Sequence, residues 1–298
     1  MTKLIECVPN FSEGRRQDVI DTIADAIATV ADVNLLHVTS DYDHNRTVMT
    51  FAGSPEGVMR AAYNAIKIAS ELIDMTQHSG VHPRIGATDV VPFIPLEGAT
   101  MDDCIEISRE LGQKVADELN LPVYLYEYAS IRPERKSLAI IRRGQYETLV
   151  NSITELDRQP DYGKPVMGSA GAVTIGARKA LIAYNVYLTT DDVTIAQKIA
   201  RSIRGSSGGL RGVKALGLLV KGRAQVSMNL VDYQNTPIYR VMELIRLEAS
   251  KLGVQIYESE LIGLMPQDAL IQSARWYLQL PQLSDSDILE NQLNSSKK

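Results

Sequence analysis

The sequence predicts an α/β (α+β) protein whose two halves repeat one order of elements, β-α-β-β-α-β. Short runs rich in β-branched residues alternate with longer runs whose apolar residues keep helical spacing. The order of these runs up to residue 95 returns after residue 180. Hydrophobic residues make up 45% of the 298 residues, which is ordinary for a globular protein with sizeable cores.

In the first half, helical spacing begins after Ser12-Glu13-Gly14, and Pro55 suits the first turn of a second helix. We expect strands at 4–8, 33–39, 47–52 and 90–95, and helices at 17–30 and 55–75. A further helix at 102–120 and a strand at 123–126 extend this half.

In the second half, Asp191 and Asp192 favour a helix start, and Gly253 is a good C-cap residue. We expect strands at 180–188, 213–220, 224–231 and 254–257, and helices at 190–203, at 236–252 and after Pro266. Each half then has the order of a ferredoxin-like unit. We expect an N-terminal subdomain at 1–180 and a C-terminal subdomain at 181–298, whose sheets face each other across a ligand cleft.

Charge and composition exclude several function classes. Lys and Arg total 31 against 36 Asp and Glu, a net charge of −5, which disfavours nucleic acid but allows a small basic pocket for an acidic ligand. Cys7 and Cys104 cannot form a disulfide framework or, alone, a zinc site, and we expect buried reduced thiols. With no signal peptide and no run of about 20 apolar residues, we expect a cytoplasmic protein that does not enter a membrane.

A polar loop, Gln77-His78-Ser79-Gly80-Val81-His82-Pro83-Arg84-Ile85-Gly86, lies between an expected helix and an expected strand. A histidine here suits a general base, and Arg84 suits a carboxylate clamp. The spacing of His78 and His82 also allows zinc, although Gly80 and Pro83 argue against a continuous helix. A solvated loop without a role is the remaining alternative.

A second polar segment, Asp41-Tyr42-Asp43-His44-Asn45-Arg46, joins two expected strands. Asp, Asn and His also form turns, which is the simpler interpretation. A nearby carboxylate can orient a histidine or raise its pKa. Asn10 ends the first strand at the same edge of such a unit as the His82 loop, so we expect these groups to converge.

Segment 161–179 between the halves contains glycines at 163, 168, 171 and 176. Such glycines permit close approach to a flat ligand, although a linker is the alternative. The spacing does not fit a nucleotide loop, and Arg178 would suit an anionic partner. In the second half, the strand around Gln225, Ser227 and Asn229 offers alternating polar groups to a cleft or to solvent.

These segments together resemble the glutamate formimidoyltransferase family, over essentially the whole chain. The resemblance is carried by Cys7-Val8-Pro9-Asn10-Phe11-Ser12-Glu13-Gly14, His82-Pro83-Arg84-Ile85-Gly86, Pro92-Phe93-Ile94-Pro95, Pro122-Val123-Tyr124-Leu125-Tyr126 and Gly176-Ala177-Arg178-Lys179. It implies transfer of a formimidoyl group from N-formimidoyl-L-glutamate to tetrahydrofolate, a co-substrate, with no metal. It also implies a homodimer, two subdomains meeting at a folate cleft, and a separate cyclodeaminase downstream.

By the same resemblance, His82 matches the family's catalytic base. The folate-contacting segment matches Gly163, Lys164, Pro165, Val166, Met167, Gly168, Ser169, Ala170 and Gly171. Substrate-binding candidates are Asn10, Asp41, Asp43, His44, Arg46, Arg84 and Arg178, with Arg46 and Arg84 expected to hold glutamate's carboxylates. Vertebrate relatives carry an Asp where this chain has Thr39. If that carboxylate assists catalysis, either Asp41 or Asp43 substitutes for it or the step runs without it.

Two alternatives stand beside this interpretation. A formyl group is nearly isosteric with formimidoyl, so 5-formyltetrahydrofolate with glutamate is a candidate side reaction. A non-catalytic folate or amino-acid sensor is the second alternative, because ferredoxin-like pairs also serve as binding modules.

Overall fold

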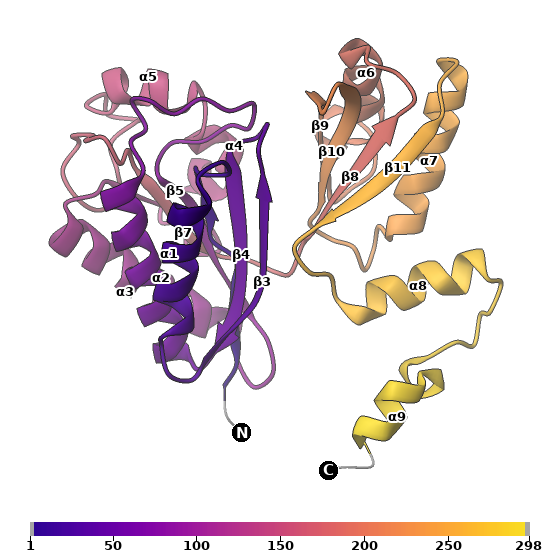
Figure 1. Ribbon diagram of the computed structural model, residues 1–298, viewed down its shortest axis with the longest axis horizontal. Helices are drawn as coiled ribbons and strands as arrows, with labels where there is room; N and C mark the ends of the chain where they lie inside the picture. Colours follow the sequence, from indigo (N-terminus) through magenta and orange to yellow (C-terminus); the bar gives the residue numbers. More distant parts are fainter. Residues whose placement is uncertain (1–2, 296–298) are drawn as a thin grey trace. The chain divides into compact units, whose positions relative to one another are not determined.

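The structure is a computed structural model that describes residues 3–295. The chain divides into two compact units, the first ending at Lys179 and the second beginning at Ala180, and each unit has its own sheet (Figure 1). Within the described part of the chain, no helix combines the length and apolar composition that crossing a membrane requires.

The first unit contains a seven-stranded sheet in the order β3-β4-β1/β2-β5-β7-β6. Strand β1 lies between β4 and β5 and is antiparallel to both, as the ferredoxin-like order requires, so that expectation is confirmed. Strands β7 and β6 extend the sheet in parallel beyond β5. The elements are β1 (Ile5–Cys7), β2 (Asn10–Phe11), α1 (Gln17–Ala28), β3 (Val33–Asp41), β4 (Arg46–Gly53), α2 (Pro55–Leu72), β5 (Thr88–Pro95), α3 (Met101–Leu119), β6 (Val123–Glu127), η1 (Pro133–Lys136), α4 (Leu138–Ile141), α5 (Gln145–Ser152) and β7 (Val173–Ala177).

Three features of this unit differ from expectation. The strand expected at 4–8 ends at Cys7 and resumes at Asn10, because Pro9 has no N–H for the ladder. Strand β7 lies in the glycine-rich segment that also fitted a linker, and all five of its residues are buried. Helices α4 and α5 fill a stretch for which the pattern predicted no element.

Helices α1, α2 and α3 form the core of the first unit with the sheet. Ser54 accepts a hydrogen bond from the Gly57 amide at the start of α2, and the buried face of that helix is mostly alanine. Thr100 and Asp103 form a capping box at the start of α3. Both cysteines are free and buried, as expected.

The second unit has the same topology, with the strand order β11-β8-β10-β9 and all neighbours antiparallel. Its elements are β8 (Ile182–Leu188), α6 (Val193–Ile203), η2 (Gly205–Ser207), β9 (Val213–Val220), β10 (Arg223–Leu230), α7 (Ile238–Lys251), β11 (Ile256–Ile262), α8 (Gln267–Tyr277), η3 (Asp285–Asp287) and α9 (Leu289–Ser295). Strand β11 begins two residues later than expected and ends five residues beyond the expected end. Its polar and apolar residues do not alternate clearly, so the sequence pattern does not mark where the strand ends.

One edge of the first sheet brings together polar ends of several strands. Asp41 pairs with Arg46 where β3 turns into β4, and Asn10 pairs with both β4 and β5. The loop that contains His82 enters β5 at Thr88 on this edge. We call this region the site edge.

Candidate functional site

Two polar loops of the site edge are held against each other by hydrogen bonds. Loop 77–87 follows α2, and turn 42–45 joins β3 to β4. The Val81 amide donates to a carbonyl of the turn (3.3 Å), and Asn45 Nδ2 donates to the carbonyl of Ser79 (3.1 Å). The expected convergence of the two segments is therefore present.

His82 is arranged as a neutral base. Its Nδ1 lies 2.8 Å from the Pro83 carbonyl oxygen, so Nδ1–H donates there and the lone pair on Nε2 faces the N–H of Arg46 Nη1. Burial lowers the pKa of His82 well below its usual value, and the positive charges of Arg46 and Arg142 lower it further. The imidazole is neutral near pH 7 and can accept a proton.

Arg46 is a cation without an ion-pair partner in the described residues. Its Nη2 donates to Asn10 Oδ1, and Nη1 lies against both ring nitrogens of His82. Its Nε is buried and has no hydrogen-bond partner. Burial and the charge of Arg142 lower the pKa of Arg46 to about 9, although Asp89 opposes them. Such a guanidinium is suited to an incoming carboxylate.

His44 is oriented by Asp41. The Asp41 carboxylate lies 3.1 Å from His44 Nδ1 and accepts the His44 backbone N–H at 2.7 Å. The ring lies edge-on to that of His82, with centroids 5.9 Å apart. His44 Nε2 is buried and has no hydrogen-bond partner. Like Arg46 Nε, it is a polar atom at the site edge that is available to a ligand.

Arg84 lies in this region but is fully engaged by protein groups. Its Nη1 donates to Gln145 and Glu147, both at 2.9 Å, and its Nη2 pairs with Glu147 at 2.5 Å. Its Nε donates to His78 Nδ1 at 3.1 Å. The side chain is buried, and its geometry does not favour the carboxylate clamp predicted for it.

His78 has protein partners on both ring nitrogens. Nδ1 accepts from Arg84, and Nε2–H donates to the Asn45 carbonyl at 3.1 Å. This tautomer makes His78 a support for the turn rather than a partner of His82 in a zinc pair. Within residues 3–295, no group of three metal-ligating side chains comes together.

Arg142 is a functional candidate that the sequence did not indicate. It follows α4 and pairs with Asp89, which in turn accepts the Ile85 amide at 3.0 Å. Its charge lowers the pKa of both His82 and Arg46, so it lies within electrostatic reach of each. No sequence signal pointed to it, because the ion pair joins positions 53 residues apart.

Two other residues predicted to bind substrate, Asp43 and Arg178, lie at opposite ends of the first unit's sheet. Asp43 lies in the turn, where its carbonyl accepts from the His82 loop. Arg178 lies at the opposite end of β5, where its amide donates to the Phe93 carbonyl at 3.0 Å. The first unit therefore does not bring Arg178 to His82.

The C-terminal part of the glycine-rich segment lies directly beside the His82 loop. Gly171 bridges to Gly86, and the Ala87 amide donates to the Ala170 carbonyl at 2.8 Å. A Cβ at Gly86 would lie 2.1 Å from the Ala172 carbonyl oxygen, so this approach requires glycine.

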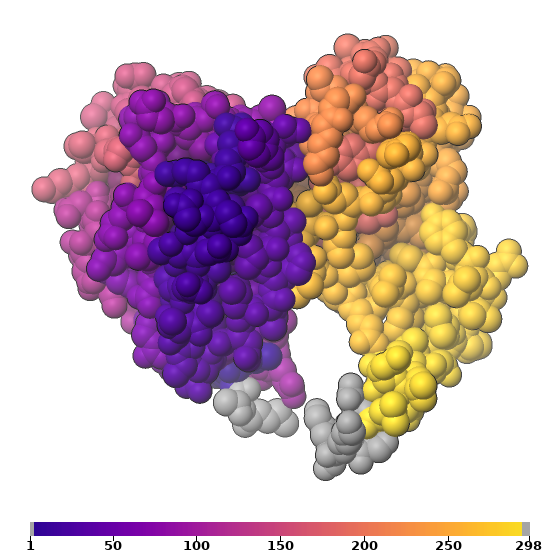
Figure 2. All heavy atoms as spheres, viewed as in Figure 1, coloured from indigo at the N-terminus to yellow at the C-terminus, as the bar shows by residue number. Residues whose placement is uncertain are grey.

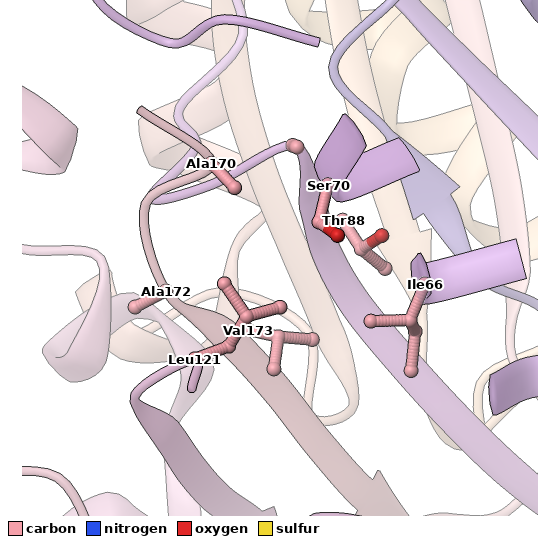
Figure 3. Close-up of a pocket in the computed structure, with 8 residues that line it drawn as sticks. Ile66, Ser70, Thr88, Leu121, Ala170, Ala172 and Val173 are labelled. Atoms are coloured by element: carbon pink, nitrogen blue, oxygen red, sulfur yellow. The ribbon is translucent and has the colours of Figure 1, made fainter. Parts of the chain in front are cut away.

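A recess lined by Ala170, Ala172 and Thr88 opens next to this contact, and Figure 3 draws its lining. It has no room for a water molecule. The earlier part of the segment packs elsewhere, with Gly163 against Leu121.

The chain is an α+β protein of two subdomains, and its first unit brings a neutral histidine together with an arginine that forms no ion pair within residues 3–295. The formiminotransferase domain, N-terminal subdomain, matches residues 4–178, and the formiminotransferase domain matches residues 183–293. A glutamate formimidoyltransferase of Thermoplasma acidophilum is 49% identical over 297 residues, covering 98% of each chain. That of Streptococcus pyogenes serotype M1 is 46% identical, covering 98% of this chain and 99% of its own. The chain belongs to the formiminotransferase family.

A longer relative matches only in part of its length. The formimidoyltransferase-cyclodeaminase of Rattus norvegicus is 44% identical over 286 residues, which covers 93% of this chain and 53% of the rat protein. The similarity therefore extends over about half of the length of the rat protein.

Proposed function

We propose that this protein is a glutamate formimidoyltransferase, which moves the formimidoyl group of N-formimidoyl-L-glutamate to N5 of tetrahydrofolate. The observation that carries the proposal is the match to stand-alone glutamate formimidoyltransferases over 98% of the chain. The products are 5-formimidoyltetrahydrofolate and L-glutamate.

His82 is the general base of the proposed reaction. The N5 amine of tetrahydrofolate attacks the amidine carbon, and His82 Nε2 accepts the proton that N5 loses. The C–N bond to glutamate then breaks, and the imidazolium returns the proton to the departing nitrogen. The proton on Nδ1 and the lowered pKa of His82 support this role.

Arg46 is the proposed carboxylate ligand of the glutamate substrate, with Arg142 rather than Arg84 beside it. The unpartnered Nε of Arg46 and the lack of an ion pair within residues 3–295 support this assignment. Asp41 is the proposed substitute for the aspartate that vertebrate relatives carry where this chain has Thr39. Thr39 Oγ1 is hydrogen-bonded to His37 Nδ1 at 2.9 Å, whereas Asp41 orients His44.

Tetrahydrofolate is the proposed co-substrate, with residues 163–171 as one of its contacts. The proximity of Gly168–Gly171 to the His82 loop supports this assignment. The proposed functional subdomains are residues 1–180 and 181–298. No step of the proposed reaction calls for a metal.

We further propose a cytoplasmic homodimer that passes its product to a separate cyclodeaminase. Exposed apolar side chains on and after α8, coloured yellow in Figure 2, support a protein interface there: Leu270, Trp276, Tyr277, Leu278 and Leu280.

Turnover of N-formimidoyl-L-glutamate with tetrahydrofolate tests the proposal, with product read as methenyltetrahydrofolate after acid treatment. We expect activity in the parent and a loss of roughly 10²-fold or more in His82→Ala. Folate binding without turnover in the parent would favour a sensor, and turnover only of 5-formyltetrahydrofolate with glutamate would move the assignment to formyl transfer.

A further inference from the structure

A β-bulge places a buried carboxylate at the site edge. Between Asn10 and Phe11, the pairing of β2 with β5 passes over one residue of β5, Asp89, which is the extra residue of the bulge. Bulges re-aim a side chain and are frequent next to active sites. Asp89 is only 2% exposed, and its neighbour across the bulge, Asn10, accepts a hydrogen bond from Arg46. The bulge therefore lies beside the arginine of the site.

Both oxygens of the Asp89 carboxylate have partners in the first unit. Oδ1 accepts the Ile85 amide at 3.0 Å and Arg142 Nε at 3.3 Å, and Oδ2 accepts Arg142 Nη2. Ile85 follows His82 by three residues in the same loop. One carboxylate thus ties the backbone of the His82 loop to the guanidinium of Arg142 through charge-assisted hydrogen bonds.

The segment that carries Arg142 has further contacts with the same loop. Gln145 has φ +56°, a conformation that residues other than glycine rarely adopt. This backbone brings the Gln145 side chain to Arg84 Nη1 at 2.9 Å and the Tyr146 amide to the Arg84 carbonyl at 3.0 Å. Backbone strain that persists at such a contact is typical of segments that position a site.

The charges that face His82 come from several elements. Burial lowers its pKa most, and Arg46 on β4 and Arg142 after α4 lower it further. His44 in the turn adds a smaller effect in the same direction. Burial and Arg142 also lower the pKa of Arg46 to about 9, whereas the charge of Asp89 raises it. Asp89 therefore offsets part of the positive charge that an incoming carboxylate meets at Arg46.

We propose that Asp89 is a positioning residue: its carboxylate fixes the His82 loop against Arg142 and moderates the positive charge of the substrate site. Asp89 does not touch the reacting atoms, and it acts through Arg142 and the Ile85 amide. The inference rests on the proposed function, because it takes the site edge as the place where the glutamate substrate binds. Removing only the charge of Asp89 should then strengthen the binding of a dicarboxylate while it weakens turnover.

The test compares Asp89→Asn with a matched control, Asp161→Asn. Asp161 is also buried, accepts a backbone amide (Leu125, 2.7 Å) and pairs with an arginine (Arg135, 2.6 Å). The probe is glutarate, a dicarboxylate with the carbon skeleton of glutamate, and calorimetry measures its Kd. We expect Asp89→Asn to lower this Kd roughly 3–10-fold and to lower kcat roughly 10-fold. Asp161→Asn should lower the thermal midpoint to a similar extent and leave the Kd of glutarate unchanged within about twofold.

A Kd of glutarate that stays the same or rises in Asp89→Asn, or a kcat equal to that of the parent, would overturn the inference. If Asp89→Asn fails to fold, Arg142→Lys takes its place, because lysine keeps the charge but cannot contact both carboxylate oxygens as a guanidinium does. It should lower kcat roughly 3–10-fold and change the Kd of glutarate less than about threefold, and a parental kcat would contradict the proposal.

The two proposals fail in different ways. An active parent whose Asp89→Asn variant gains no affinity for glutarate overturns this inference alone. Tighter binding of glutarate by Asp89→Asn, with a parent that does not turn over N-formimidoyl-L-glutamate, overturns the proposed function alone.

Discussion

At the scale of single residues, the site depends on which charged groups have partners within the protein. Arg84 donates to three side chains, whereas Arg46 has a buried Nε without a partner. The two arginines looked alike in the sequence, since each stands in a polar loop close to a histidine. Tertiary packing decides which groups each arginine contacts, and the spacing of residues along the sequence does not reveal those contacts.

We therefore expect Arg46→Met to affect substrate binding more than stability, and Arg84→Met to affect stability more than substrate binding. Arg46→Met should raise the KM for N-formimidoyl-L-glutamate by 10-fold or more, because a charge-assisted contact is worth about 1.5–3 kcal/mol. Its free energy of unfolding should be largely maintained, because the guanidinium removed is half-buried and forms no ion pair within residues 3–295. Urea unfolding and initial rates measure both quantities.

Arg84→Met should lower the free energy of unfolding by about 1–2 kcal/mol, with a smaller effect on that KM. The estimate is modest because its partner Glu147 is largely exposed and regains water. A larger KM effect in Arg84→Met than in Arg46→Met would reverse the assignment of the two arginines.

The lowered pKa of His82 predicts the pH dependence of the reaction. In the proposed reaction the neutral form of His82 is active. We therefore expect kcat/KM to stay constant as the pH falls below 6.5, and to decrease only when the pH reaches the lowered pKa of His82 in the folded protein. Arg46→Met removes one of the charges that lower this pKa, so its acid limb should move to higher pH. A limb that moves to lower pH, or stays in place, would contradict the proposed role of Arg46.

The same pKa affects stability. Below pH 6.5 the unfolded chain binds a proton at His82 that the folded protein does not yet bind. The free energy of unfolding should therefore decrease as the pH falls from 6.5 towards the folded pKa. His82→Asn should weaken this dependence, as urea unfolding at a series of pH values will measure.

At the scale of elements, loop 77–87, which carries the proposed base His82, is held against the glycine-rich segment. Gly171 has φ +74°, and a Cβ there would lie 2.4 Å from the Ile85 carbonyl oxygen. Gly171→Ala should lower the free energy of unfolding by about 1–3 kcal/mol and reduce kcat. Gly168→Ala is the control for the free energy of unfolding, because no atom lies within 4 Å of its Cβ. An equal loss of that free energy in the two substitutions would contradict this role.

The sequence predicted the elements whose signals are local and missed those that depend on distant partners. Both β-α-β-β-α-β units follow from hydrophobic periodicity, proline and capping residues within each segment. Strand β7 was missed because its glycine at 176 resembles a linker, whereas the structure needs it beside Tyr126. Arg142 was missed because only tertiary folding brings it to Asp89.

At the scale of the whole molecule, each unit has a core of its own. The second unit buries residues of β8, β10, α6 and α7 in one cluster that contains no residue of the first. A fragment of residues 180–298 should therefore unfold cooperatively, as followed by circular dichroism in urea. A broad, non-cooperative transition would mean that its stability depends on the first unit.

Strand β5 has hydrogen-bonded neighbours on both sides, β1 and β2 on one and β7 on the other. Its amides belong to the interior of a seven-stranded sheet, where exchange with solvent requires the largest openings of a fold. The loop that carries His82 joins this strand directly at Thr88. We therefore expect the amides of β5 to exchange slowly, so the loop that carries the proposed base His82 is joined to one of the most stable parts of the first unit, and we expect substrate binding and product release to move other segments more than this strand.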